Sequence, residues 1–196
     1  NEVRQASSDI WSQALGQIAV KGNNEKEKVK FYSALYNAHF LPRAFSDVDG
    51  SYPRFDGDGQ IMKMDHGTYY CDFSQWDTYR AVHPLFSILT PSRNGDMAHS
   101  LVLKGQQGGW LPIFPSWNSY TAAMIGDHCI AMIGDAIVKD TPGFDYEEAY
   151  TLMRKNAFEA NPDSGSYRDG KGRRAMESYL KYNYVPLEDQ VTEAFH

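Results

Sequence analysis

The stretch Gly105–Cys129 reads GQQGGWLPIFPSWNSYTAAMIGDHC. It follows one helical pattern, turns through paired glycines and runs into an apolar helical pattern. Two helices joined by a loop are the building unit of mainly α folds, so the stretch indicates a helical hairpin. Trp110 and Trp117 lie in the loop, and Asp127 and His128 stand at its end. The two tryptophan rings, next to the Asp127 carboxylate and the His128 imidazole, either pack the turn or line a pocket for a flat, polar ligand.

Helical patterns occupy most of the chain on both sides of this stretch. Apolar residues recur at helical spacing, and Gly22 and Pro42 supply breaks, while Asn23 or Asn24 can cap the second helix. Consecutive helices joined by short and medium loops predict a mainly α architecture, either a solenoid or a ring of helical hairpins. The expected helices cover residues 2–20, 25–40, 74–89 (broken or kinked at Pro84), 94–107, 119–140, 145–160, 172–183 and 187–196.

Residues 45–71 interrupt the helices with a segment rich in glycine and aspartate. Within it, RFDGDGQIMKM at residues 54–64 predicts one short β-hairpin around a glycine turn. The motifs DVDG at Asp47 and DGDG at Asp56 suggest a calcium loop, but neither places glycine at the sixth loop position of an EF-hand. Turn chemistry is therefore the favoured interpretation of both motifs.

Composition and motifs exclude several classes of function. A net charge of −6 without a Lys/Arg stripe argues against nucleic-acid binding, and no apolar stretch reaches the ~20 residues of a membrane span. Serine-hydrolase elbows, zinc-protease motifs and Cys-x-x-Cys pairs do not occur. Cys71 and Cys129 form either one disulfide or, as we favour, two buried thiols. Both ends lie within helical patterns, so we expect residues 1–196 to be a single segment of a longer domain.

The segment CDFSQWDTYRAVHPLF, residues 71–86, combines two faces of a helix. Trp76, Arg80 and His83 fall on one stripe, and an apolar stripe that begins with Tyr79 runs beside it. The helix either buries Trp76 next to a structural Arg–Asp pair or lines a cavity. A cavity with aromatic rings, carboxylates and arginine suits a sugar, because its apolar face stacks on a ring and its hydroxyls bind charged groups.

Four blocks carry a family resemblance: FYSALYNAHFLPRAFSDVDG, YYCDFSQWDTYRAVHPLFSIL, GQQGGWLPIFPSWNSYTAAMIGDHCIAMIGDAIVKD and GRRAMESYLKYNYVP. In order and over nearly the whole chain, they resemble the catalytic domain of glycoside hydrolase family 92, bacterial exo-acting α-mannosidases. The resemblance implies a segment of an (α/α)6 toroid. It also implies an inverting, calcium-dependent hydrolysis of terminal α-linked mannose, and a β-sandwich domain that precedes the toroid.

The same resemblance assigns residues. It implies substrate contacts for Asp72, Trp76 and Arg80, and further contacts for Trp110 and His128. Neither the Glu-Gly-Asn block of the general acid nor the Gly-Asn-Asp-Asp block of the general base occurs, so both catalytic groups are expected outside this chain. Asp47 and Asp49 match the family's DVDG block without an assigned role, and no residue is matched to a calcium ligand.

The implied partners are a mannose-containing oligosaccharide, such as an N-glycan, and the remainder of the same enzyme. The implied location is the periplasm, the cell surface or the exterior of a bacterium. Two alternatives stay open: a non-catalytic carbohydrate-binding or scaffold fragment, and another (α/α)-barrel glycosidase or lyase, which the length of the matching blocks disfavours.

Overall fold

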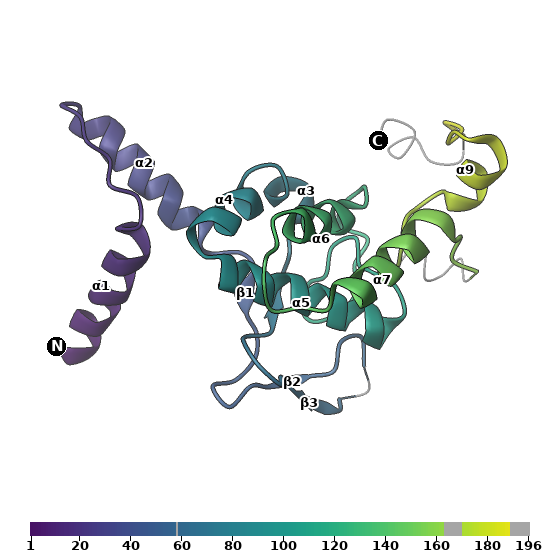
Figure 1. Ribbon diagram of the computed structural model, residues 1–196, viewed down its shortest axis with the longest axis horizontal. Coiled ribbons are helices and arrows are strands. Elements are labelled where there is room, and N and C mark those ends of the chain that lie inside the picture. Colours follow the sequence, from purple (N-terminus) through teal and green to yellow (C-terminus); the bar gives the residue numbers. More distant parts are fainter. Residues whose placement is uncertain (58, 163–169, 189–196) are drawn as a thin grey trace. The chain divides into compact units, whose positions relative to one another are not determined.

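The computed structural model describes residues 1–57, 59–162 and 170–188 (Figure 1). The chain divides into two compact units, Asn1–Leu41 and Pro42–His196. As predicted, the described residues are mainly helical. No helix among them is long and apolar enough to cross a membrane.

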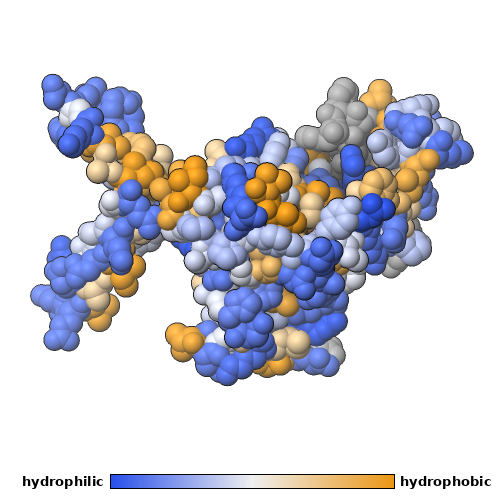
Figure 2. Space-filling view, in the orientation of Figure 1, coloured by the Kyte–Doolittle hydropathy of each residue, from blue (hydrophilic) through white to orange (hydrophobic). Residues whose placement is uncertain are grey.

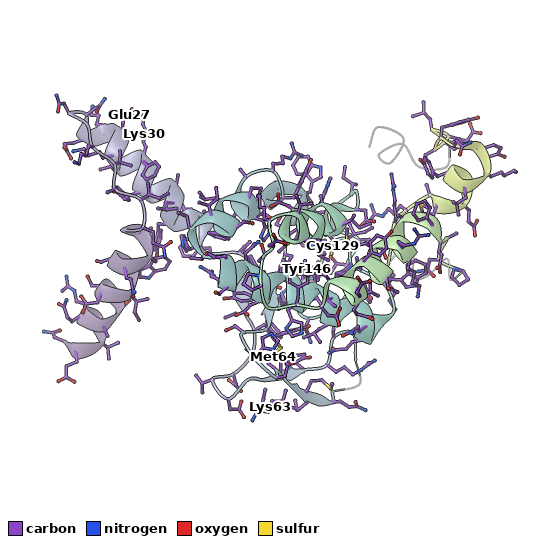
Figure 3. The ribbon with its side chains drawn as sticks, viewed as in Figure 1. Glu27, Lys30, Lys63, Met64, Cys129 and Tyr146 are labelled. Carbon is purple, nitrogen blue, oxygen red and sulfur yellow. The ribbon has the colours of Figure 1, made fainter. Side chains whose placement is uncertain are left out.

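The first unit pairs α1 (Glu2–Leu15) with α2 (Glu25–Ala38). Trp11 packs on Tyr36, with ring centroids 4.4 Å apart. The Asn24 side chain caps α2 as predicted, accepting hydrogen bonds from two backbone N–H groups of its first turn. Glu27 and Lys30 form an exposed ion pair on α2 (Figure 3).

The helix predicted over residues 2–20 ends early, at Leu15. The Tyr32 hydroxyl donates to Ile18 O (2.9 Å) and accepts from Val20 N (3.2 Å), which holds this backbone outside the helix. Apolar side chains are exposed along both helices (Figure 2), and Val3 is 84% exposed.

The second unit contains two small antiparallel sheets where one hairpin was predicted. β2 (Ser51–Pro53) pairs with β3 (Ile61–Lys63) around the predicted glycine turn. β1 (Arg43–Ala44) pairs with β4 (Tyr70–Cys71). The β1–β4 pairing joins segments that are far apart in the chain, so local sequence patterns do not predict it.

The helices described in this unit are α3 (Gln75–Thr78), α4 (Val82–Leu89), α5 (Pro91–Gly108), α6 (His128–Val138), α7 (Tyr146–Phe158) and α9 (Met176–Tyr182). Of these, α4, α6 and α7 pack against α5 (Figure 1), which also contacts β4, and α3 contacts α6.

Two predicted helices have different bounds in the structure. The break between α3 and α4 lies at residues 79–81, and Pro84 sits in the first turn of α4, where its missing N–H costs nothing. The helix predicted over 119–140 begins only at His128. Thr121 Oγ1 donates to Phe114 O (2.7 Å), and Gly126 has a φ of 76°, so residues 119–127 form a loop.

The last two predicted helices have different outcomes. The helix predicted over 172–183 begins at Met176, because Ala175 adopts a left-handed backbone with a φ of 56°. Most of the helix predicted over 187–196 lies outside the described residues.

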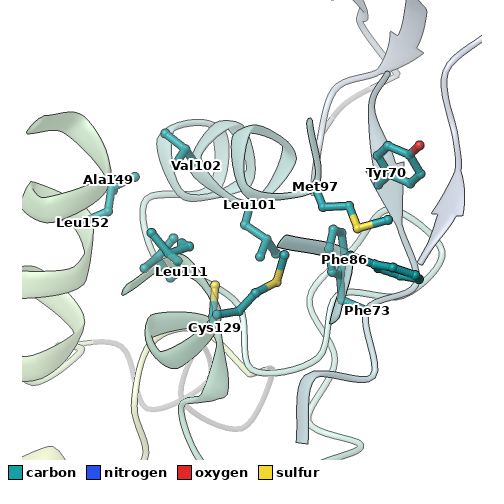
Figure 4. Packing of buried hydrophobic residues seen from close by; sticks show 12 residues of the cluster. Tyr70, Phe73, Phe86, Met97, Leu101, Val102, Leu111, Cys129, Ala149 and Leu152 are labelled. Carbon is teal, nitrogen blue, oxygen red and sulfur yellow. The ribbon is translucent and has the colours of Figure 1, made fainter. Parts of the chain in front are cut away.

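One apolar core joins α5 to its neighbours (Figure 4). Leu101 of α5 is fully buried, and Leu111 reaches the same cluster from the loop that follows α5. Cys71 and Cys129 are both buried and unbonded to each other, as predicted. The cluster consists of Tyr70, Phe73, Phe86, Met97, Leu101, Val102, Leu111, Cys129, Met132, Ile133, Ala149 and Leu152.

A buried lysine lies beside this core. The ammonium group of Lys104 on α5 is inaccessible to solvent and donates to Tyr70 O at 2.6 Å. It also lies 3.6 Å from the ring centroid of Tyr69, a cation–π geometry. Burial lowers the pKa of Lys104 to about 7. Lys104 thereby ties α5 to β4.

The packing of α5 can be tested at Gly95, where the backbone of Pro142 lies very close. A Cβ atom at Gly95 would lie 1.8 Å from Pro142 O, so the Gly95→Ala variant must displace backbone. We expect its free energy of unfolding to fall by ~2–3 kcal/mol, measured by urea denaturation. Gly134→Ala in α6 is the control, because its Cβ would meet only Met153 Cε at 3.5 Å. A Gly95→Ala variant as stable as that control would contradict the packing.

Candidate functional site

Asp72 is a buried carboxylate with four hydrogen-bond donors around it. It follows β4 in a left-handed conformation (φ 62°) and is 6% exposed. Oδ2 accepts from Nε (2.6 Å) and Nη2 of Arg43, and Oδ1 accepts from Ser116 Oγ (3.1 Å) and Trp117 N (2.9 Å). Burial alone would raise the pKa of Asp72, but the bonds from Trp117, Arg43 and Ser116 outweigh it and lower the pKa.

The bonds to Asp72 fix the loop that carries Trp117. The Asn118 side chain strengthens that loop by donating to Pro53 O (2.6 Å) and accepting from the Tyr69 hydroxyl (2.8 Å). Trp117 itself is 79% exposed, and with Arg54 it borders an open hollow of about 340 Å³. An exposed ring on a rigidly bonded loop is a platform on which a flat ligand can stack.

A second group of side chains, here called the Trp76 cluster, consists of Trp76, Tyr79, Arg80 and His128. The Arg80 guanidinium lies over the Trp76 ring at 4.4 Å and over the Tyr79 ring at 5.3 Å. The Tyr79 ring in turn stacks on the His128 ring at 4.4 Å, with an interplanar angle of 4°. Within the part of the chain that the structure describes, Arg80 has no carboxylate at ion-pair distance and Trp76 Nε1 has no hydrogen-bond partner.

Gly126, two residues before His128, has a backbone conformation that favours glycine. Gly126 has a φ of 76°, and a Cβ atom there would lie 2.6 Å from His128 Nε2. A larger residue at this position would therefore displace the imidazole that starts α6 and stacks on Tyr79.

Trp110 packs the turn after α5. It is 9% exposed, and the Lys155 ammonium lies 4.4 Å from its ring centroid. Its backbone is bonded on both sides to the Tyr120 hydroxyl, which accepts from Trp110 N (3.3 Å) and donates to Trp110 O (2.5 Å). These contacts match the packing interpretation of this tryptophan.

Three of the five predicted residues, Trp76, Arg80 and His128, therefore come together. Asp72 makes its contacts with Arg43 and the Trp117 loop, and Trp110 with Lys155 and Tyr120. Sequence reasoning missed Tyr79, which the helical wheel assigned to an apolar stripe. It also missed Arg43, whose pairing with Asp72 spans 29 positions.

Comparison with known proteins identifies the family of the chain. The model for the glycosyl hydrolase family 92 catalytic domain matches residues 1–195. The chain belongs to glycosyl hydrolase family 92. A search of curated proteins found no match for this family 92 chain.

Solved structures of family 92 enzymes resemble the chain closely. The α-mannosidase BT3965 from Bacteroides thetaiotaomicron is 34% identical with a TM-score of 0.84, and the match covers 96% of this chain and 24% of that protein. Its complex with mannoimidazole gives a TM-score of 0.82 at 34% identity, covering 96% and 23%. The inverting mannosidase BT2199 from the same organism is 28% identical with a TM-score of 0.80, covering 93% and 24%. The chain thus spans about a quarter of the length of these relatives.

The calcium that the family resemblance implies does not fit the five predicted residues. Calcium binds oxygen ligands, and Asp72 is the only carboxylate among the five. Both Asp72 oxygens already accept bonds from Arg43, Ser116 and Trp117. Asp72 therefore holds the Trp117 loop and offers no free oxygen to an ion.

The Asp72 geometry predicts a loss of stability in the Asp72→Asn variant. An amide cannot accept from all four donors and presents N–H groups to some of them, so the free energy of unfolding at pH 7 should fall by ~2–3 kcal/mol. Because the folded state lowers the pKa of Asp72, its stabilisation is complete above the unfolded value of 3.8 and is lost as pH falls further. The difference between variant and wild type should accordingly shrink below about pH 4.

Urea denaturation followed by circular dichroism measures both effects. Asp140→Asn is a matched control, since Asp140 has a similar backbone (φ 51°) but is exposed. Equal stability of the two variants would show that Asp72 does not hold the loop.

Proposed function

We propose that this chain forms one side of the sugar pocket of an exo-acting α-mannosidase that hydrolyses its substrate with inversion. Membership in family 92 carries the proposal. It is supported by a relative at 34% identity that is an α-mannosidase and binds mannoimidazole, and by one at 28% identity that is an inverting mannosidase. The substrate is a terminal α-linked mannose of an oligosaccharide.

The Trp76 cluster supplies the chemistry for holding a sugar. Arg80 is exposed, its guanidinium lies over the Trp76 and Tyr79 rings, and its Nε donates to Trp76 O at 3.3 Å. The remaining guanidinium N–H groups are donors in a fixed fork that suits neighbouring hydroxyls. Stacking on Trp76 and Tyr79 limits the entropy lost when Arg80 binds. The cluster therefore contributes orientation of the substrate rather than proton transfer.

Inverting hydrolysis needs two further carboxyl groups. One protonates the leaving oxygen, and the other activates water on the opposite face, with the pair ~6.5–9.5 Å apart. We assign both to the remainder of a longer polypeptide whose helices complete an (α/α)6 toroid with those of this chain. We assign no calcium ligand within this chain, so none of the steps assigned to it passes through the ion.

Turnover tests the proposal directly. The intact polypeptide that contains this chain should, with calcium present, release mannose from an α-linked mannobiose. Proton NMR of the first product should show the β-anomer, because inversion converts the α-linkage. Release of α-mannose would contradict inversion. Absence of any release would favour a non-catalytic sugar-binding or scaffold role.

Substitution of Arg80 separates substrate binding from structural packing. In the intact enzyme Arg80→Ala should lower kcat/KM by ~10- to 1000-fold, because a desolvated charged hydrogen bond to the sugar is lost, with little change in Tm. Arg80→Lys keeps the charge but not the fork and should give an intermediate value.

Arg154→Ala is the matched control, since Arg154 is also exposed and lies over two rings, Tyr150 and Phe158. Wild-type kinetics for Arg80→Ala with a lowered Tm would assign Arg80 to packing alone.

A further inference from the structure

Three potential metal ligands outside the Trp76 cluster lie close together. Asp65 and His66 follow β3, just after Met64 (Figure 3), and His99 lies on α5. One ligand atom from each lies within 4.8 Å of the others. The two imidazole rings are nearly parallel, with centroids 4.9 Å apart.

The hydrogen bonds of His66 define what its ring offers. Nε2 lies 3.0 Å from Gly143 O, which can only accept, so Nε2 carries the proton. In a neutral ring Nδ1 then presents a lone pair, and it lies 2.9 Å from Asp65 Oδ1, another acceptor. Two acceptors at this distance repel each other unless a cation, either a proton or a metal ion, lies between them.

The surroundings of His99 favour a metal ion over a proton as the cation between His66 and Asp65. Its Nδ1 is buried and has no hydrogen-bond partner among the described residues. A proton on His66 would satisfy Asp65 and leave His99 unexplained. A metal ion would use the lone pairs of all three groups.

We propose that Asp65, His66 and His99 bind a divalent transition-metal ion of the zinc class. Two imidazoles and one carboxylate suit Zn²⁺ or Ni²⁺, whereas Ca²⁺ and Mg²⁺ prefer oxygen ligands alone. The bond from His66 Nε2 to Gly143 O is the outer contact that orients metal-binding histidines. The proposal does not depend on the mannosidase assignment.

The geometry requires only a small closure. Bonds of about 2.1 Å in a tetrahedral site place ligand atoms about 3.4 Å apart. Ligand atoms that now lie up to 4.8 Å apart must therefore approach by about 1.4 Å, whereas Asp65 Oδ1 and His66 Nδ1, at 2.9 Å, must separate slightly. The Asp65 side chain can adjust by giving up the bond that Oδ1 accepts from His66 N, since it is 75% exposed. Asp96, one turn before His99 on α5, adds a negative charge that favours a cation at both histidines. The bound ion would tie the turn after β3 to α5.

Calorimetric titration with ZnCl₂ tests the site in the intact polypeptide, with excess calcium present to saturate oxygen-ligand sites. We expect His66→Ala and Asp65→Asn each to remove one zinc site or weaken it on the order of 100-fold. Asp47→Asn, an exposed aspartate of the same segment, should leave zinc binding unchanged. Zinc should also raise the Tm of wild type, and a chelator should reverse the rise.

Cobalt gives an independent readout, since Co²⁺ at a tetrahedral site absorbs in the visible range and the band should disappear in His99→Gln. Folding of each variant is checked by circular dichroism. The proposal fails if folded wild type binds no zinc above the level of the His66→Ala variant. It also fails if the three ligand substitutions leave zinc affinity and the cobalt band unchanged.

Discussion

Two buried ionisable side chains at β4 constrain the second unit. Lys104 reaches from α5 to the carbonyl of Tyr70, and the Asp72 carboxylate accepts hydrogen bonds from Arg43, Ser116 and Trp117. Burying such a group costs free energy unless partners compensate for the lost water, so each group holds its partners in one arrangement. The short strand thus fixes α5, β1 and the Trp117 loop relative to one another.

This constraint explains how exposed rings acquire fixed positions. Trp117 is largely open to solvent, yet its backbone and that of its neighbour Asn118 are bonded to buried groups. Trp76 and His128 lie at the starts of two helices and are linked through Arg80 and Tyr79. Buried polar bonds position Trp117, whereas ring stacking and the Arg80 guanidinium hold Trp76, Tyr79 and His128 together.

The family and the mainly helical fold could be predicted from the sequence, because both depend on residues that are contiguous in the chain. The two buried thiols were predicted correctly, and so was a hairpin with a glycine turn, although its first strand, Ser51–Pro53, lies just before the predicted residues 54–64. The helix bounds near Gly126 were wrong, because the Thr121 bond to Phe114 O and a left-handed glycine override local helical periodicity. The β1–β4 pairing could not be predicted, as neither strand is long enough to show alternation.

The sequence by itself determined the family and the presence of helix–loop–helix units with aromatic and basic residues at their ends. Helical spacing already placed Trp76 beside Arg80, but only the tertiary structure decided that His128 joins them through Tyr79 and that Asp72 pairs with Arg43. It also decided that Asp65 and His66 face His99 across two elements. The physical reason is that side-chain periodicity is local, whereas buried charges and ring stacks join residues tens of positions apart.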